Sequence, residues 1–387
     1  MSDFIHMNHG DSSKRSELMR LLNTSFGFDT PETEFEGLLP KLYNEEYDPA
    51  KNNIILDVNG EMRAAVGLYY NTLTVCGEEL KTGGIGNVAC HPNYRSMGYM
   101  RFCMAYALDE MKQNMTDFSF LCGKRQRYER YGYTMAGFRY EFTFMKENVS
   151  RIYGKDKKSA LTARPIEKSD SAVFKEISEI YNSRDFKAER NAENMYDILL
   201  SWHGKPYAVF LGDEFKGWFV LDGGENSALE VGYKNKDDIA EIVICVLETS
   251  GKSSIDIRVP PFDKPLSDYL ALNCEWYDVG HPDFYNIFCY ERVIRAFLKL
   301  KATYTKLADG ELNMLIEGSK LPEQIKIKVK NGNITVAETT DKPDIALTHM
   351  EAMRLVGSLY SEKRSELKPE CASWFPLPLF TYSQDNV

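Results

Sequence analysis

Residues Gly83–Ala107 read GGIGNVACHPNYRSMGYMRFCMAYA, and within them the spacing of apolar residues changes from that of a strand to that of a helix. Pro92 ends the strand because proline carries no backbone N–H donor. From about Gly98 onward the apolar residues recur at helical intervals; they are Met100, Cys103, Met104, Ala107, Leu108 and Met111. The stretch therefore predicts a strand, a turn over residues 91–97 and a helix that begins near Gly98.

The start of this helix has the chemistry of an anion site. Its first backbone N–H groups have no partner within the helix, and the positive end of the helix dipole lies there. Arg95 adds a positive charge, and Gly98 has no Cβ to hold a pyrophosphate away from the backbone. A phosphate-bearing cofactor is therefore predicted at this turn, although an ordinary turn before a helix would fit these few residues too.

The turn resembles the acetyl-CoA-binding motif of the GNAT N-acetyltransferases, Gln/Arg-x-x-Gly-x-Gly/Ala. Arg95 and Gly98 match it, whereas Met100 departs from its last position. The resemblance implies that acetyl-CoA is the acetyl donor, with its pyrophosphate on the N–H groups around Gly98 and its pantetheine arm along the preceding strand. The predicted cofactor-binding residues are Val88, Ala89, Arg95, Ser96, Met97, Gly98, Tyr99 and Met100.

A second motif follows in the order that the family has. Residues 127–133 read RYERYGY and resemble the GNAT pattern aromatic-Tyr-x-x-x-Gly-aromatic, with Arg127 in place of the leading aromatic. In the family this tyrosine lies on a short helix beside the CoA sulfur, so the resemblance implies that Tyr128 is the general acid. A phenol with a pKa of about 10 holds a proton at neutral pH that a departing thiolate can take. Tyr128 alone could be a packing residue, but the two motifs together predict a GNAT catalytic domain over residues 1–147, closed by a strand over 138–145.

The residues before the turn fit the same fold. Residues 13–26 are typical of an amphipathic helix, and the Asn59-Gly60 dipeptide predicts a hairpin that leads to a third strand over 80–90. The intervening segment 28–36 is rich in acidic residues, among them Asp29. It is either a solvated loop or one wall of a pocket for an amine acceptor, and Asp29 is a candidate ligand of that amine.

Composition limits the possible functions. A chain of 387 residues is too long for one core and predicts two or three domains. Its formal net charge of −10 disfavours a nucleic-acid partner and suits a cationic small molecule or a basic peptide. No apolar run approaches the roughly 18 residues of a membrane span, so we expect no membrane partner and a cytoplasmic protein. The eight cysteines contain no Cys-x-x-Cys pair, and we expect them to be reduced core residues rather than disulfides or metal ligands.

The second region, residues 148–290, repeats the strand, turn and helix layout of the first. Strands are predicted over 207–211, 216–221 and 228–233, followed by a helix over 237–248. The turn between them lacks Arg-x-x-Gly and carries Lys234 and Lys236 instead. We interpret this region as a degenerate GNAT-like domain without a cofactor site; an unrelated α/β domain is the alternative.

The third region, residues 291–387, begins with a helix over 293–300. Strands are predicted over 310–317, 324–330 and 334–338, followed by an extended segment over 344–348 and a helix over 349–360. This arrangement resembles the sterol-carrier-protein-like domain, whose members bind lipid, although in a fused chain the domain more naturally has a structural role. The predicted fold class is thus α/β with mixed sheets: two GNAT-type domains in tandem and a sterol-carrier-protein-like domain.

This three-part arrangement resembles the Eis-type (enhanced intracellular survival) acetyltransferases. The resemblance implies acetyl transfer to a primary amine of an aminoglycoside, a polyamine or a lysine side chain, and a homohexamer. It also implies that the α-carboxylate of Val387 is the general base. Asp385, like Asp29, is a candidate for binding a polyamine acceptor. The apolar tail fits a buried segment; its apolar members are Trp374, Phe375, Leu377, Leu379, Phe380 and Tyr382. A tail that only packs between domains, a base at His91, and a non-catalytic CoA- or lipid-binding protein are the alternatives.

Overall fold

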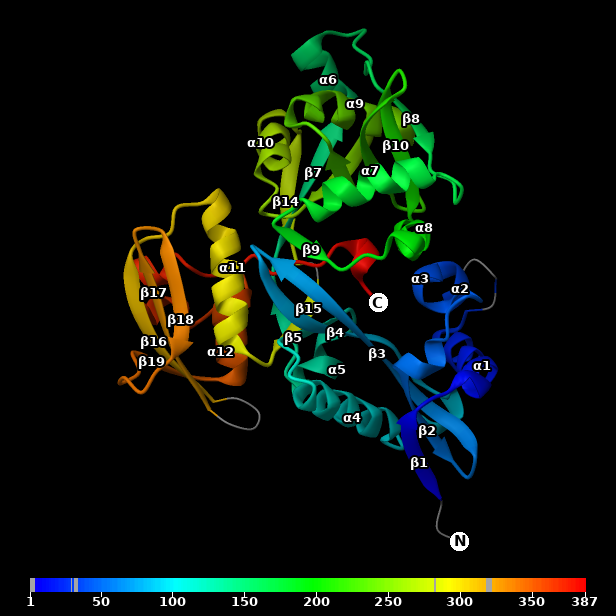
Figure 1. The fold of residues 1–387 in the computed structure, drawn as a ribbon, viewed down its shortest axis with the longest axis vertical. Helices are drawn as coiled ribbons and strands as arrows, with labels where there is room; N and C mark the ends of the chain where they lie inside the picture. The colour runs from blue at the N-terminus through cyan, green and yellow to red at the C-terminus, as the bar shows by residue number, and fades with distance from the viewer. Residues whose placement is uncertain (1–3, 29, 31–33, 282, 318–321) are drawn as a thin grey trace.

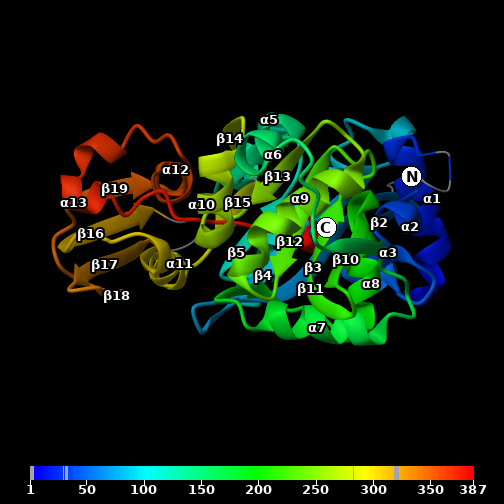
Figure 2. The same cartoon turned by 90° about the horizontal axis from the view of Figure 1, so that it is seen from above.

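The computed structural model describes residues 4–28, 30, 34–281, 283–317 and 322–387, which fold into three sheets with helices packed against them (Figures 1 and 2). The first sheet has the strand order β1-β2-β3-β4-β5-β15-β6, with β9 beside β3. Its strands are β1 Ile5–His9, β2 Asn53–Val58, β3 Glu61–Val75, β4 Glu78–Cys90, β5 Phe118–Leu121, β6 Thr134–Ala136, β9 Phe186–Ala188 and β15 Asp283–Ile287.

Two helices cover opposite faces of this sheet. Alternate residues of a strand point to opposite faces, so Ala64 of β3 packs with α4 (Tyr99–Gln113) while its neighbour Ala65 packs with α1 (Arg15–Phe26). The Asn59-Gly60 hairpin between β2 and β3 is confirmed. So is the strand, turn and helix around the opening stretch of the sequence.

Strands β4 and β5 separate along their length. They pair in parallel only over residues 82–84 and 118–120. Beyond Gly84 the edge of β4 no longer meets β5, although β4 continues to Cys90 and stays paired with β3 on its other side. The separation opens the sheet at the carboxyl ends of two parallel strands, where ligand sites of α/β sheets usually form.

The strand predicted to close the first domain belongs instead to the second sheet. β7 (Arg139–Met145) pairs with β13 (Ser254–Val259) and β14 (Trp276–Gly280). In exchange, β15 inserts between β5 and β6 of the first sheet, where all five of its residues are buried. The prediction that residues 138–145 complete the first sheet is therefore wrong, because each region supplies a strand to the other.

The second sheet has the order β14-β7-β13-β12-β11-β10-β8 and repeats the layout of the first. Antiparallel β10, β11 and β12 lead into helix α9 and then into β13, which is parallel to β12 only over 227–228 and 256–257. The start of α9 differs from that of α4, since Asp237 and Asp238 directly precede the helix and Glu241 lies in its first turn, where these carboxylates would repel a phosphate. The remaining bounds are β8 Thr162–Pro165, β10 Lys205–Leu211, β11 Glu214–Leu221, β12 Ser227–Tyr233, α6 Lys146–Tyr153, α7 Ser171–Asn182, α8 Met195–Leu200, α9 Ile239–Ser250 and α10 Lys264–Asn273.

The third sheet has the order β18-β17-β16-β19, and α11 and α12 pack against it. The predicted strands and helices are present; they are α11 Tyr290–Tyr304, β16 Gly310–Glu317, β17 Glu323–Lys330, β18 Asn333–Glu338, β19 Ile345–Thr348, α12 His349–Gly357 and α13 Pro369–Ala372. The likeness of this part to a sterol-carrier protein stays a prediction. Among the described residues, no helix is long and apolar enough to span a membrane.

The predicted burial of the C-terminal tail is confirmed. Trp374, Leu377 and Leu379 are fully buried, and the chain then runs between the first two sheets, so that its end lies beside β3 and β4 rather than in solvent (Figure 1). The eight cysteines are free thiols, and Cys103, Cys245 and Cys371 are core residues as expected. Cys122 is exposed, because it follows the last residue of β5 at the opening of the sheet.

Candidate active site

A cleft of about 960 Å³ lies at the start of α4. Gly98 precedes the helix with φ +83°, a left-handed conformation that side chains other than glycine rarely adopt. Apart from its own chain neighbours, the described residue within 4 Å of a Cβ on Gly98 would be Arg101, at 3.9 Å, so the space next to this backbone is open. We call this space the cofactor cleft; its lining residues are Ser25, Phe26, Val88, Cys90, Arg95, Ser96, Met97, Gly98, Tyr99, Met100, Arg101, Lys124, Arg127 and Arg130.

The structure brings together seven of the eight predicted cofactor-binding residues. Val88 and the residues from Arg95 to Met100 line the cleft. Ala89 does not, because adjacent strand residues point to opposite faces, and its side chain is buried on the α1 side of the sheet against residues such as Ala65. Any role of Ala89 is limited to its backbone.

The cofactor cleft is strongly cationic in a chain with an excess of carboxylates. Among its described lining residues, the charged side chains are all basic; they are Arg95, Arg101, Lys124, Arg127 and Arg130. Arg95 donates to the Ser25 carbonyl at the end of α1 at 3.0 Å, which holds it beside the helix start. Basic side chains and free helix N–H groups together fit a ligand that carries several phosphates, as CoA does.

Tyr128 lies on the short helix α5 (Arg125–Tyr128), as predicted. Its side chain is buried over Gly123, where a Cβ would come within 2.5 Å of the ring. Burial raises the pKa of Tyr128, and the nearby Arg127 opposes that shift only in part. The phenol therefore keeps its proton at neutral pH.

Residues from the C-terminal half of the chain support the segment that follows Tyr128. Asn286 of β15 donates from Nδ2 to the Tyr131 carbonyl at 2.9 Å, and His349 Nε2 lies 3.3 Å from the Gly132 carbonyl. Gly132 itself has φ +90°. The backbone around the predicted acid is thus fixed from two sides.

Val387 lies where β4 and β5 separate. A Cβ on Gly86 would be 3.2 Å from the carboxyl carbon of Val387, and one on Gly84 would be 2.6 Å from its Cγ2. Phe120 of β5 also lies next to the Gly84 position, which Val387 contacts, and Tyr128 packs on Gly123. Phe120 and Gly123 are three residues apart, which is about 10 Å of extended chain.

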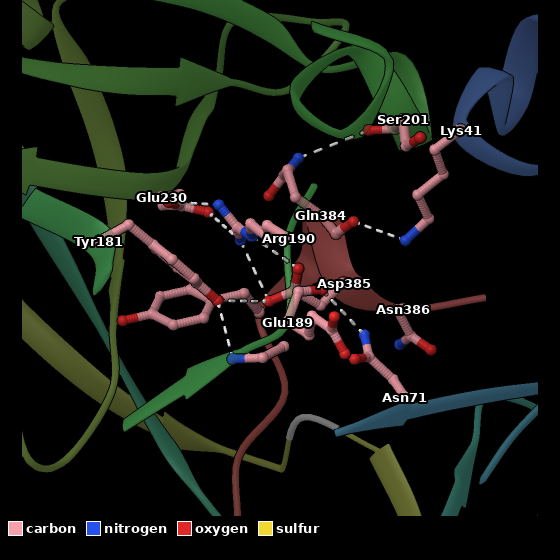
Figure 3. A network of polar contacts seen from close by, with 12 residues as sticks. Lys41, Asn71, Tyr181, Glu189, Arg190, Ser201, Glu230, Gln384, Asp385 and Asn386 are labelled. Atoms are coloured by element: carbon pink, nitrogen blue, oxygen red, sulfur yellow. Dashed lines mark hydrogen bonds and ion pairs between the residues drawn. The ribbon is translucent and has the colours of Figure 1, made fainter. Parts of the chain in front are cut away.

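The residues before Val387 are held by partners from β15, from the turn Ser201–His203 and from the short helix Pro40–Tyr43. Asn386 donates to Asp283 of β15 at 2.7 Å, and its carbonyl accepts from Trp202 Nε1 at 3.3 Å. Burial raises the pKa of Asp283 to about 8. Gln384 is fully buried, and its carbonyl accepts from Lys41 at 2.6 Å, while burial lowers the pKa of Lys41 to about 7 (Figure 3).

The remaining sequence candidates are placed differently. The carboxylate of Asp385 is engaged within the protein, because Arg190 and Tyr181 donate to it and its side chain is 7% exposed (Figure 3). Asp29 lies outside the described residues. His91 accepts from the Asn93 N–H at 3.3 Å and so caps the turn before α4.

Sequence reasoning missed the polar residues that hold the tail. Arg190, Glu230 and Lys41 belong to no motif, and their partners are 40 or more positions away in the chain. It also missed a buried network behind the β4 edge, in which Tyr43 donates to Asn87, whose φ is +38°. The positive φ of Asn87 marks this network locally in the structure, but the sequence does not reveal that angle.

The family described as "Acetyltransferase (GNAT) domain" matches residues 7–136, which include the cofactor cleft and Tyr128. This segment is a GNAT acetyltransferase domain. The predicted enzyme class, an acyltransferase, follows from it. No curated protein sequence matches the chain.

Solved structures extend the likeness in fold to the rest of the chain. A GCN5-related N-acetyltransferase from Anabaena variabilis is 13% identical, with a TM-score of 0.70 over 99% of this chain and 100% of its own. One from Kribbella flavida is 16% identical, with a TM-score of 0.65 over 91% and 88%. Eis1 from Mycobacterium abscessus is 14% identical, with a TM-score of 0.61 over 91% and 89%. At these identities the likeness shows the fold of the GNAT enzyme and not its acceptor.

Proposed function

We propose that this GNAT enzyme moves an acetyl group from acetyl-CoA to a primary amine of a cationic acceptor: an aminoglycoside, a polyamine or a lysine side chain. One arrangement supports this most: the cationic cofactor cleft reaches Val88 of β4, Val387 lies against Gly84 and Gly86 of the same strand, and the buried phenol of Tyr128 packs on Gly123, two residues after β5. In this proposal, donor, acid and base lie along the two strands that separate there.

In this mechanism the CoA phosphates bind the basic side chains of the cleft and the N–H groups around Gly98. The pantetheine arm lies along the edge of β4 that β5 leaves free, with Val88 beside it. The Val387 carboxylate takes a proton from the acceptor ammonium, directly or through water. The neutral amine attacks the thioester carbonyl, and a tetrahedral intermediate forms. Its collapse breaks the carbon–sulfur bond, and Tyr128 protonates the departing thiolate. The nitrogen then gives its second proton to the Tyr128 phenolate, directly or through water, which restores the phenol, and the proton on Val387 leaves to solvent.

A carboxylate is a weak base for an ammonium ion, so the site must narrow the difference between their pKa values. Burial favours the neutral form of both groups, because it raises the pKa of a carboxyl and lowers that of an ammonium. Val387 is half-buried beside Gly84, Gly86 and Phe120, which supports such a shift. The amide product carries no charge, so turnover converts a cationic group into a neutral one.

The acceptor class rests on two further points. The whole chain carries a formal net charge of −10 although its cofactor cleft is cationic, and this excess of carboxylates favours the approach of a cation. The likeness in fold to Eis1 fits the Eis-type arrangement predicted from the sequence. The Eis-type homohexamer, the cytoplasmic location and the sterol-carrier-like nature of residues 291–387 belong to the same proposal.

Release of free thiol from acetyl-CoA, measured over a panel of aminoglycosides, polyamines and basic peptides, tests the proposed reaction. At least one cationic amine should drive stoichiometric release together with an acetylated product. Tight CoA or lipid binding without release for any amine would instead identify the alternative, a non-catalytic binding protein on this scaffold.

Tyr128→Phe tests the acid. We expect acetyl-CoA binding to persist and turnover to fall by about 10² or more, which is the usual contribution of general acid catalysis. Tyr131→Phe is the matched control, since the Tyr131 hydroxyl is buried without a hydrogen-bond partner among the described residues. Equal turnover in the two variants would remove Tyr128 from the mechanism.

A further inference from the structure

The second domain holds the end of the chain through a buried ion pair (Figure 3). Arg190 donates from Nε and Nη2 to the Asp385 carboxylate at 2.7 and 3.1 Å. It also donates from Nη1 and Nη2 to the Glu230 carboxylate at 3.1 and 2.8 Å. One guanidinium therefore joins β12 of the second sheet to a residue two positions before Val387. We call Arg190 and Glu230 the tail clamp.

The tail clamp is inaccessible to water. The side chains of Arg190 and Glu230 are 1% and 0% exposed, and that of Asp385 is 7% exposed. The free-energy penalty of removing charged groups from water is about as large as the attraction between them in the interior, so a buried ion network adds little to the stability of the fold. Its geometry is nevertheless strict, because a bidentate guanidinium fixes both the direction and the distance of its partners.

Further contacts tie Arg190 to the first sheet. It lies two residues after β9, which pairs with β3, and the N–H of the intervening Glu189 donates to the Thr72 carbonyl at 2.9 Å. The guanidinium lies 4.0 Å from the centre of the Tyr181 ring, and Tyr181 donates its hydroxyl to Asp385 at 3.1 Å. The clamp is thus fixed relative to β3, the strand next to β4, on which Val387 lies.

The internal repeat places the two contacts with the tail at equivalent points. In the first sheet, parallel pairing ends at Gly84, and Gly86, two residues later, lies against Val387. In the second sheet, parallel pairing ends at Ala228, and Glu230, two residues later, holds Arg190 and through it Asp385. The opening that receives the donor in the first repeat is used in the second to fix the chain's own tail.

We propose that the tail clamp is a catalytic positioning device: Arg190, held by Glu230, sets the place of the Val387 carboxylate against the acceptor amine. This inference rests on the proposed function and gives the degenerate second domain a part in it. Arg190 is a positioning residue, since it acts through Asp385 and touches no reacting atom.

Asp385→Asn is the principal test, because it removes the ion pair with Arg190 at constant size and leaves the Arg190–Glu230 pair intact. We expect acetyl-CoA to bind with unchanged affinity and kcat to fall by about tenfold to 10², as misplacing a reacting group by about 1 Å does. In the wild type, the dependence of kcat on pH is set by the terminal base. In Asp385→Asn, kcat should instead rise with pH in proportion to the fraction of the acceptor that is present as free amine. Formate, as a diffusible base, should restore part of the turnover.

Together with Asp385→Asn, the variants Arg190→Gln and Arg190→Gln/Asp385→Asn form a double-mutant cycle, which measures the coupling between the two residues. If both residues act through one interaction, the double variant should be no slower than the slower single variant. Arg295→Gln is the matched control: it removes another arginine–carboxylate pair, in which Nε donates to both oxygens of Glu78 of β4, and its kcat and pH profile should remain those of the wild type. Should Arg190→Gln fail to fold, Asp385→Asn alone decides the question.

The outcomes separate this inference from the proposed function. If replacing the terminal carboxylate abolishes turnover while folded Asp385→Asn keeps the wild-type kcat and pH profile, the clamp does not position the base and the inference is overturned. If replacing the carboxylate leaves turnover unchanged, the proposed base itself is wrong.

Discussion

Gly84→Ala places a methyl group where Val387 now lies. The new Cβ would be 2.6 Å from Val387 Cγ2 and 3.2 Å from the Phe120 ring, whereas carbon atoms in contact lie about 3.5–4.0 Å apart. The terminal residue must therefore move by about 1 Å. A misplacement of that size costs about 10² in rate at a reacting group, or about 2.7 kcal/mol in the activation barrier.

Gly83→Ala is its matched control, because the adjacent residue points to the opposite face of the sheet. There the new Cβ would meet Met111 Sδ at 2.6 Å, and a methionine side chain can rearrange. Thiol release at saturating substrates gives kcat, calorimetry gives the acetyl-CoA affinity, and thermal unfolding gives stability. We expect Gly84→Ala to lose kcat at unchanged affinity and Gly83→Ala to lose at most some stability. Equal kcat values in both variants would show that the place of Val387 does not matter for the reaction.

Two further predictions concern charge. The double variant Arg101→Gln/Arg130→Gln should bind acetyl-CoA about tenfold or more weakly than the wild type, and its affinity should be less sensitive to salt. Arg125→Gln is the control, because Arg125 lies outside the cleft and pairs with Glu129, and it should change neither property. Equal affinities in the two variants would remove Arg101 and Arg130 from the cofactor site. The pKa of Asp283 is raised to about 8 in the folded protein, so its contribution to stability is fully present below about pH 4 and is lost as pH rises to about 8. The free energy of unfolding of the wild type, relative to that of Asp283→Asn, should therefore fall by at least about 1 kcal/mol from pH 5 to pH 8. Denaturant titrations at the two pH values measure this difference. No change with pH would contradict the burial of a titrating carboxyl there.

Features with a local cause could be predicted from the sequence. The hairpin at Asn59-Gly60 follows from the backbone preferences of two adjacent residues, and the helix start at Gly98 follows from the change in apolar spacing. The burial of the C-terminal tail follows from its apolar composition. Tyr128 was found on a short helix because its motif is contiguous.

Features that depend on distant pairing could not be predicted. The exchange of β7 and β15 between sheets brings together strands that compete with closer neighbours, and no residue type records which pairing is more stable. Arg190 and Asp385 are 195 positions apart, and Arg190 belongs to no motif in the sequence. Asp385 was predicted to bind the acceptor, whereas the structure shows its carboxylate holding the tail through Arg190 and Tyr181.

The terminal carboxylate is tested most directly by a chain in which Val387 ends in a carboxamide, prepared by ligating a synthetic C-terminal peptide. The carboxamide has nearly the same size but cannot accept a proton at neutral pH. If the Val387 carboxylate is the base, this protein should bind acetyl-CoA as the wild type does and release thiol at least about 10² more slowly. Formate should then restore part of the rate. Unchanged thiol release with an unchanged dependence on pH would show that another group takes the proton from the acceptor amine.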